Sequence, residues 1–360
     1  MSNHTSTSGL LLALALTIAA PALAQPAPPQ PPRGGPDESM RRPPYQQGRE
    51  EQTDRQTRTL KLGAQGELAL ANLAGDIVVT RSSGTEATIE IVKTARARTT
   101  DEARAMLGLV DVSVVEREGR AEVKAIYGRG DDWRGDRGER GDRGGRGSRR
   151  MSVSVAYTVA APAQTRLTVG SVSGNVRVSD IRGDLSISSV SGGVRIANAG
   201  RIAEAKSISG NVEIVDSQVD GAIEAQSVSG NVLLRKVGAR RIEVGSVSGS
   251  VALQDLKCDR VEGHSVSGGI EFSGPLSKGG RYEFASHSGE ARITMDGGTG
   301  FELAARSFSG SVRADLPLVQ DAGDRNDAPR DRHSLRGVHG DGSAVLSITT
   351  FSGDIVVGKR

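Results

Sequence analysis

A short phrase built on Ser-x-Ser-Gly returns along the chain and constrains its fold more than any other feature. SVSGNV occupies Ser171 to Val176, and eight further copies follow it. The first eight glycines lie 18 to 21 residues apart, and the last gap of 43 residues contains a polar insertion. A period near 20 residues predicts stacked supersecondary units that bury their apolar faces against one another. The glycines are Gly174, Gly192, Gly210, Gly230, Gly249, Gly268, Gly289, Gly310 and Gly353.

Apolar and polar residues alternate on both sides of each glycine. Ile242 and Val244 precede one copy, and Val176 and Val178 follow another. Period two with β-branched residues predicts strands, and no copy keeps the 3.6-residue period of a helix. Two short strands joined by glycine bends make one turn of a β-solenoid. We therefore predict an all-β fold, a β-solenoid of about nine coils over residues 165–360, about 40 Å long at the strand spacing.

The phrase itself is interpreted as the corner between two strands. Glycine recurs because the bend needs either a positive φ or a close approach of the next coil, and a Cβ obstructs both. Asn175, Asn211 and Asn231 follow the glycine, as suits a residue that tolerates turns and bonds its local backbone. Both serines share the parity of the inward apolar residues, so we expect both to face inward. Nine equivalent copies argue against a serine nucleophile, because catalysis needs one activated site.

The middle residue of the phrase raises a conflict between strand parity and hydrophobicity. Alternation places it outside, yet eight of its nine members are apolar. We expect the corner to rotate this residue inward, since burying each Val is worth about 1.5–3 kcal/mol. The alternative is an exposed ridge covered by the cap, a partner chain or a ligand. The members are Val172, Val190, Ile208, Val228, Val247, Val266, His287, Phe308 and Phe351.

At this point the chain resembles the bacterial putative-adhesin family of β-solenoid repeat proteins, a domain of unknown function. The resemblance rests on AYTVAAPAQTRLTVGSVSGNVRV (Ala156 to Val178) and on the serial SVSGNV, SVSGG and SFSGSV phrases. It covers residues 60–360 apart from two insertions. It implies a β-solenoid that binds at surfaces, and it carries no catalytic residues over to this chain.

The N-terminus has the features of an export signal. Leu10 to Ala20 is an apolar run of signal-peptide length, and Ala22-Leu23-Ala24 supplies a cleavage site. We expect a signal peptide over residues 1–24, a proline-rich and charged linker over 25–56, and a mature chain that is periplasmic, on the cell surface or secreted. Nothing later in the sequence is apolar for long enough to cross a membrane.

Residues 57–164 are predicted to form a small α+β cap on the solenoid. ATIEIVKTA and MSVSVAYTVAAP have strand character, and DVSVVERE with AEVKAIY indicates a hairpin. TTDEARAMLGL is predicted to be a helix capped by Thr100-Asp101. A solenoid end exposes strand edges and core, so a lid is needed there.

Two insertions interrupt this pattern. Residues 128–150 hold eight Arg against four Asp and one Glu, a net +3 that equals the formal charge of the whole chain. We expect a loop that attracts polyanions such as anionic polysaccharide. Its RGD triplets arise by chance in such a composition, and RNA binding is not expected without interleaved aromatics. The second insertion, 318–342, is expected to be a polar loop. Candidate binding residues in the first are Arg134, Arg137, Arg140 and Arg143.

A column of carboxylates is the other candidate binding surface. Glutamates six residues before successive glycines should stack on consecutive coils, with Arg241, Arg260 and Arg281 placed to offset their repulsion. A solvated ladder is the favoured interpretation, and a site for a cation or a basic partner is the alternative. His264 and His287 share the outward face, but at the diagonal spacing of a sheet they suit a metal poorly. The column is Glu204, Glu224, Glu243, Glu262 and Glu283.

Chemistry-bearing residues are otherwise sparse, so we expect no enzyme, no catalytic residue, no cofactor and no metal. A polysaccharide-active solenoid enzyme would need converging carboxylates beside aromatic platforms, and the single tryptophan, Trp133, lies in the Arg-rich insertion. The single Cys258 excludes an intramolecular disulfide and is expected to be dispensable and unreactive. The sequence thus predicts an exported scaffold or adhesin that binds an envelope polymer or another protein, with no nucleic-acid partner. Self-association through a solenoid end or the apolar column is a further expectation.

Overall fold

A computed structural model describes residues 50–128, 153–319 and 332–359. These residues form two 13-stranded sheets, here called sheet A and sheet B, and one helix, α1 (Thr100–Leu107). Sheet A contains, in spatial order, β1 (Glu50–Leu60), β4 (Ala87–Ala97), β7 (Val153–Ala161), β3 (Ile77–Arg81), β9 (Val176–Ser179), β11 (Val194–Ala197), β13 (Val212–Val215), β15 (Val232–Arg235), β17 (Val251–Gln254), β19 (Ile270–Pro275), β21 (Ala291–Asp296), β26 (Ile355–Lys359) and β23 (Val312–Ala314).

Sheet B is the second sheet of the solenoid. It contains, in spatial order, β5 (Val110–Arg117), β6 (Arg120–Tyr127), β2 (Glu67–Ala74), β8 (Arg166–Ser173), β10 (Asp184–Ser189), β12 (Arg201–Ser207), β14 (Ala222–Ser227), β16 (Gly238–Ser246), β18 (Lys257–Ser265), β20 (Arg281–Ser286), β25 (Ala344–Thr350), β22 (Phe301–Ser307) and β24 (Ser334–His339).

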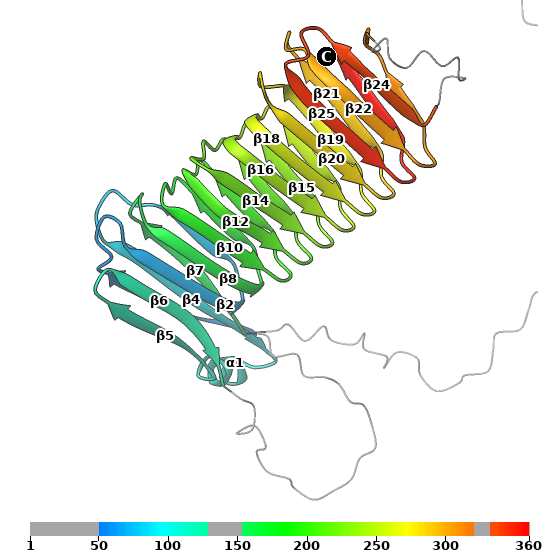
Figure 1. The fold of residues 1–360 in the computed structure, drawn as a ribbon. Coiled ribbons are helices and arrows are strands. Elements are labelled where there is room, and N and C mark those ends of the chain that lie inside the picture. The colour runs from blue at the N-terminus through cyan, green and yellow to red at the C-terminus, as the bar shows by residue number, and fades with distance from the viewer. Residues whose placement is uncertain (1–49, 129–152, 320–331, 360) are drawn as a thin grey trace, which may run out of the picture. The chain divides into compact units, whose positions relative to one another are not determined.

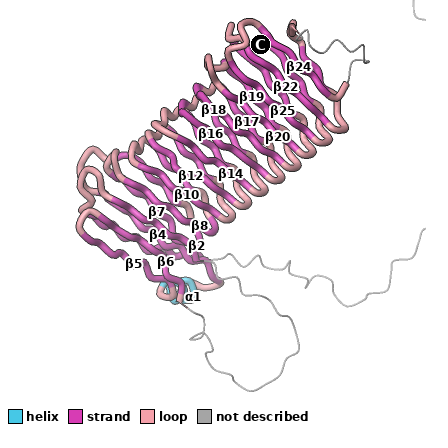
Figure 2. Tube along the Cα trace, viewed as in Figure 1, coloured by secondary structure: helices cyan, strands magenta, loops and turns pink. Residues whose placement is uncertain are grey.

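Each coil consists of one strand of sheet B followed by one strand of sheet A, and neighbouring coils pair in parallel (Figures 1 and 2). Residues at the same repeat position fall in register, so Val194 pairs with Val176 on one side and with Val212 on the other. The alternating apolar side chains of both sheets point between the sheets and are buried. The predicted all-β solenoid is therefore confirmed.

The described residues form ten such coils, one more than predicted. The extra coil is β2 with β3, the segment that contains NLAGDIVV, and it stacks in parallel on β8 and β9. The solenoid therefore starts at Glu67, and the expected start near residue 165 is wrong. Numbering the coils in space, coil 1 is β2 with β3, coil 2 is β8 with β9, and the order continues to coil 8, β20 with β21.

The last two coils do not follow chain order. β25 and β26, from the C-terminal end of the described chain, lie between coil 8 and the coil made by β22 and β23. The C-terminal repeat is therefore coil 9, and the repeat that contains Gly310 is coil 10. Beyond it, β24 adds antiparallel to β22 at the edge of sheet B. Residues 334–339 of the expected 318–342 loop are thus a strand, and 320–331 lie outside the described residues.

The N-terminal cap extends both sheets with strands that are antiparallel to one another, although β7 and β6 are each parallel to the solenoid strand beside them. β1, β4 and β7 continue sheet A beyond coil 1, and the predicted hairpin of β5 and β6 continues sheet B. β1 begins at Glu50, so the expected linker over 25–56 extends too far. The N-cap of the helix is Thr99, one residue earlier than expected, and its side chain accepts a hydrogen bond from the backbone N–H of Glu102. Residues 1–49 and 129–152 lie outside the described residues.

Close backbone approach explains the corner glycines. A Cβ on Gly210 would overlap the carbonyl oxygen of Gly192 in the coil below, and the same overlap recurs from Gly174 to Gly353. Among the nine, a positive φ is found only at Gly174, at 139°. The general requirement is therefore space for the neighbouring coil, and a left-handed conformation is the exception.

At six corners a serine hydroxyl links the coil to the neighbouring coil in the stack. Ser227 Oγ accepts the backbone N–H of Gly230 at 2.9 Å and donates to the carbonyl of Gly210, one coil away, at 2.9 Å. The same pair of bonds is formed by Ser207, Ser246, Ser265, Ser286 and Ser307. The second serine of the phrase is exposed, so the prediction that both serines face inward is half wrong.

The asparagines also connect coils, although local backbone bonding was expected of them. Asn211 Oδ1 accepts the backbone N–H of Asn231 at 2.9 Å, and Asn231 Oδ1 accepts that of Ser250 at 2.9 Å. At the opposite corner of the coils, left-handed residues with φ between 49° and 62° turn the chain; these are Asp180, Asn198, Asp216, Lys236 and Asp255. Both corners thus repeat with the coil spacing, which aligns every outward position in a column.

Candidate functional site

The middle residue of the phrase faces solvent, which overturns the expectation that the corner rotates it inward. The Val and Ile members are 39–49% exposed, and Phe308 is 68% exposed. The inside of the corner is already filled by the glycine backbones and the bonded serine hydroxyl, so no room remains for a side chain. Coil by coil, the exposed row is Leu73, Val172, Val190, Ile208, Val228, Val247, Val266, His287, Phe351 and Phe308.

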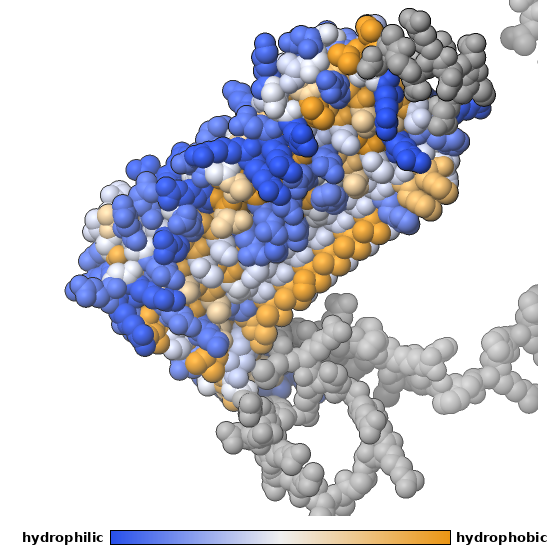
Figure 3. All heavy atoms as spheres, viewed as in Figure 1, coloured by the Kyte–Doolittle hydropathy of each residue, from blue (hydrophilic) through white to orange (hydrophobic). Residues whose placement is uncertain are grey.

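This row, here called the ridge, runs in a straight line along one border of the molecule (Figure 3). Backbone hydrogen bonds hold its members at the coil spacing: the N–H of Val190 donates to the carbonyl of Ser171 at 3.0 Å, and that of Ser191 to Val172 at 2.9 Å. At strand spacing, ten coils make the ridge about 43 Å long. Soluble monomers rarely expose so continuous an apolar surface.

Three stacked rings form one end of the ridge. His287 and Phe351 have ring centroids 4.8 Å apart at 12°, and Phe351 and Phe308 have centroids 4.8 Å apart at 7°. The stack follows the spatial order of coils 8, 9 and 10, with the C-terminal repeat in the middle. This end, here called the aromatic end, is bulkier than the aliphatic remainder of the ridge.

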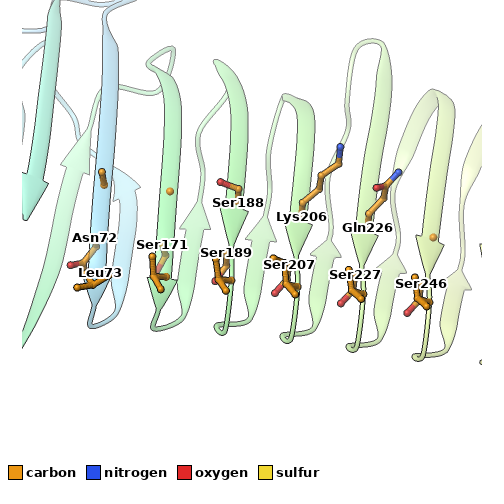
Figure 4. Close-up of a pocket in the computed structure, with 18 of the residues that line it drawn as sticks. Asn72, Leu73, Ser171, Ser188, Ser189, Lys206, Ser207, Gln226, Ser227 and Ser246 are labelled. Atoms are coloured by element: carbon orange, nitrogen blue, oxygen red, sulfur yellow. The ribbon is translucent and has the colours of Figure 1, made fainter. Parts of the chain in front are cut away.

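A groove of about 1090 Å³ follows the ridge over coils 1 to 7. Its floor consists of the outward residues that precede each buried serine, and Figure 4 shows Lys206 and Gln226 extending from this floor beside the row of serines. Ile126 and Tyr127 of β6 wall it at the coil 1 end. In coil order, the floor residues are Ala71, Gly170, Ser188, Lys206, Gln226, Gly245 and His264.

The floor is nearly neutral because its one lysine is paired. Lys206 Nζ lies 2.7 Å from Glu204 and 2.8 Å from Glu224, and the hydrogen bonds to these two carboxylates raise the pKa of Lys206. At the end wall, burial raises the pKa of Tyr127, although the hydroxyl donates to the carbonyl of Ala74 at 3.4 Å. Both groups therefore keep their protons at neutral pH, Lys206 as a paired cation and Tyr127 as a neutral phenol.

The carboxylate column stands beyond the groove and is largely offset by cations. Arg241 bridges Glu243 at 3.4 Å and Glu262 at 3.0 Å, and Arg260 contacts Glu262 at 2.6 Å. Burial would raise the pKa of Glu262, but the hydrogen bond from Arg260 and the two arginine charges outweigh it and lower that pKa. Two of the three expected arginines, Arg241 and Arg260, thus offset Glu243 and Glu262, whereas Arg281 forms no ion pair with the described part of the column. Lys206, which was not predicted to take part, offsets the first two glutamates of the column.

The remaining sequence candidates are not brought together. His264 pairs across the sheet with Ala285, whereas His287 belongs to the ridge, so the two histidines do not form a site. Within the described ranges, no group of three or more His, Cys, Asp or Glu is placed to hold a metal. Arg134, Arg137, Arg140 and Arg143 lie outside the described residues.

Cys258, which was expected to be dispensable, lies in the core and is 3% exposed. Its Sγ is 2.9 Å from the carbonyl oxygen of Arg260, and Tyr282 Oη donates to the Cys258 carbonyl at 2.9 Å. Burial raises the pKa of the thiol to about 11, although the hydrogen bond to the Arg260 backbone opposes the shift. The thiol is therefore protonated at neutral pH.

The coils, the corner ladder and the ridge together define a β-solenoid repeat protein with one apolar face. The chain belongs to the Toastrack DUF4097 family, whose model matches residues 67–358 and therefore all ten coils. This confirms the family resemblance derived from the Ser-Gly phrases. No curated protein matches the chain.

Solved structures that are similar to this chain over most of its length share little sequence with it. A "putative lipid binding protein" from Parabacteroides distasonis is 13% identical, with 84% of this chain and 97% of that chain covered and a TM-score of 0.45. A "putative adhesin" from Bacteroides fragilis is 15% identical, with 85% and 97% covered and a TM-score of 0.40. Among the described residues, no helix has the length and apolar character needed to span a membrane.

Proposed function

We propose that this protein is an exported, non-enzymatic scaffold or adhesin of the cell envelope that works by binding a macromolecule along the ridge. The observation that carries the proposal is the exposure of a side chain at the same corner of all ten coils, apolar in nine of them. An exposed apolar row lowers the solubility of a monomer and adds nothing to its core. We therefore infer that the row serves to bind another molecule.

The groove supports a binding role over a catalytic one. None of the described residues that line it is Asp or Glu, whereas hydrolysis of a glycosidic bond needs a carboxylate pair. Six of the buried corner serines each bond a glycine N–H and a glycine carbonyl, and Ser171 and Ser189 each bond one such group, so the partners of these hydroxyls are backbone groups and not a catalytic base. Apolar contact is what this surface offers.

Export is the second part of the proposal. The apolar run from Leu10 to Ala20 and the Ala22-Leu23-Ala24 cleavage site support it. The mature chain would begin at Gln25, and the proline-rich stretch after it would serve as a spacer. N-terminal sequencing of the protein recovered from outside the cytoplasm tests this part.

Retention of the labelled mature chain on envelope fractions of the producing cell tests the ridge. Val228→Asp places a charge at the centre of the ridge and should abolish retention without unfolding the protein, because Val228 is 44% exposed. The matched control is Val345→Asp, an exposed valine six residues before Phe351 and off the ridge. The control should bind normally.

Deleting residues 128–150 separates the ridge from the Arg-rich insertion, whose net +3 charge favours capture of anionic polysaccharide as the alternative function. On the ridge proposal, the deletion leaves retention unchanged and salt affects it little. If the deletion abolishes retention, and high salt does the same, the insertion is the binding element. If Val228→Asp binds as well as the control, the ridge is not the working face.

A further inference from the structure

The bulky rings of the ridge and the groove beside it lie at opposite ends of the molecule. The aromatic end occupies coils 8, 9 and 10, whereas the groove lies over coils 1 to 7. The floor residues of coils 1, 2 and 3 are all small, namely Ala71, Gly170 and Ser188, and Gly245 in coil 6 is the one other small floor residue. One end of the molecule is therefore bulky, and the other end is hollow.

A two-fold axis perpendicular to the ridge would bring these unlike ends together. If the axis passes between coils 5 and 6, each coil of one copy faces a coil of the other copy, and the two coil numbers add up to eleven. Coils 8, 9 and 10 of one copy then lie opposite coils 3, 2 and 1 of the other, so the three rings face the smaller ridge residues Val190, Val172 and Leu73 beside the groove. A parallel arrangement would set rings against rings.

Charge also permits contact between identical surfaces. An isologous interface brings each patch against its own copy, so an unpaired charge would face like charges. The strip beside the ridge consists of the exposed serines and the groove floor, and its central lysine, Lys206, is already paired with Glu204 and Glu224. The other cations of the strip, Lys124 and Arg306, stand at its two ends, where their long exposed side chains can extend into solvent. The arginine and glutamate columns stand farther back along the strands.

The size of the surface fits a stable pair. The ridge is about 43 Å long, and about 13 Å of strand separates it from the glutamate column. The flat area of this strip is about 560 Å², and the relief of groove and side chains adds to the accessible area. Specific interfaces bury about 800 Å² per partner, which is of the same order.

We propose that the partner of the ridge is a second copy of this chain, bound antiparallel across a two-fold axis between Val228 and Val247, with the aromatic end of each copy against the aliphatic end of the other copy's ridge. This inference rests on the proposed function, because it names the macromolecule that the ridge binds. It makes the scaffold or adhesin homophilic.

Sedimentation velocity on the mature chain provides the first measurement. We expect a dimer, and Val228→Asp should raise its dissociation constant about 30-fold or more, as for a hot-spot residue at the centre of an interface. Val345→Asp should leave the dissociation constant unchanged. A wild-type protein that stays monomeric at every concentration would overturn the proposal.

Cross-linking with a short bismaleimide then tests the orientation. Ile208 lies in coil 4 and Val266 in coil 7, so the antiparallel pairing brings each opposite the other. An equimolar mixture of Ile208→Cys and Val266→Cys chains with different tags should give mainly the mixed product. The wild type, whose only cysteine is buried, is the control. Mainly like-with-like products would overturn the antiparallel arrangement.

The two proposals fail in different ways. If the chain is monomeric while Val228→Asp still loses envelope retention, the ridge binds a different molecule, and only the second-copy inference is wrong. If the dimer forms and cross-links as expected while Val228→Asp retains envelope binding, the dimer stands and the proposed envelope function of the ridge is wrong.

Discussion

Replacing Ser227 by alanine isolates the hydrogen bonds that lock one coil to the next. Ser227 is 4% exposed, and its hydroxyl is the partner of both the Gly230 N–H and the Gly210 carbonyl, each at 2.9 Å. The methyl group of alanine fills the same corner without strain but can neither accept nor donate. Ser227→Ala therefore removes two hydrogen bonds and leaves two backbone groups unpaired in a coil at the middle of the stack.

The expected loss follows from the cost of those unpaired groups. A buried donor or acceptor left without a partner costs about 1–3 kcal/mol. The Gly230 N–H lies in a fully buried corner, whereas Gly210 is half-buried and water can reach its carbonyl. We therefore expect Ser227→Ala to lower the free energy of unfolding by about 2–4 kcal/mol, below the sum of the two upper limits.

Urea denaturation followed by far-ultraviolet circular dichroism measures this loss. Ser229→Ala is the matched control, since Ser229 is the exposed serine of the same phrase and its loss should stay within about 0.5 kcal/mol. Ser227→Thr keeps a hydroxyl, as Thr350 does at the equivalent corner of coil 9, and should recover part of the loss. Equal losses for Ser227→Ala and Ser229→Ala would refute the corner ladder as a source of stability.

Two further substitutions test the packing of the corner and of the core. Gly210→Ala should prevent folding or cost more than about 4 kcal/mol, because its Cβ overlaps the Gly192 carbonyl. Gly170→Ala, where the same Cβ meets nothing within 4 Å, should be tolerated, and thermal melts of the two compare them directly. Cys258→Ser should cost about 1–2 kcal/mol, since the hydroxyl can donate to Arg260 but is less apolar. The wild-type thiol, with its raised pKa of about 11, should react with a maleimide at neutral pH only after unfolding; rapid reaction of the native protein would show that the thiol is accessible.

Much of the fold could be predicted from sequence because each feature is repeated. A single Ser-Gly phrase is a weak signal, but nine copies at one period fix the strand alternation and the corner. The same repetition identifies the carboxylate column and the arginines that offset it. The parts that appear once are predicted less well: the start of β1 and the strand β24 lie outside the repeat and were assigned to loops.

Two features could not be predicted, for physical reasons. The order of coils 9 and 10 depends on which repeat pairs with coil 8, and the strands around Gly310 and Gly353 have the same pattern, so the sequence does not distinguish them. The ridge residues were wrongly predicted to face inward. That prediction considered the free energy gained by burying a valine but not whether the corner has room for its side chain. The glycine contacts and the serine hydroxyl fill that space, and this is visible only once the coils are stacked.

The ten coils also provide a comparison within one chain. The floor position and the ridge position both face solvent, two residues apart on the same strand end. The floor accepts Ala, Gly, Ser, Lys, Gln and His in turn, whereas the ridge is aliphatic or aromatic in nine of ten coils. Strand propensity does not explain the difference, because in most coils the ridge residue stands in the bend after the strand has ended. The monomer gains nothing from an apolar side chain there, and a uniform ridge is what the proposed partner, which would contact all ten coils at once, requires.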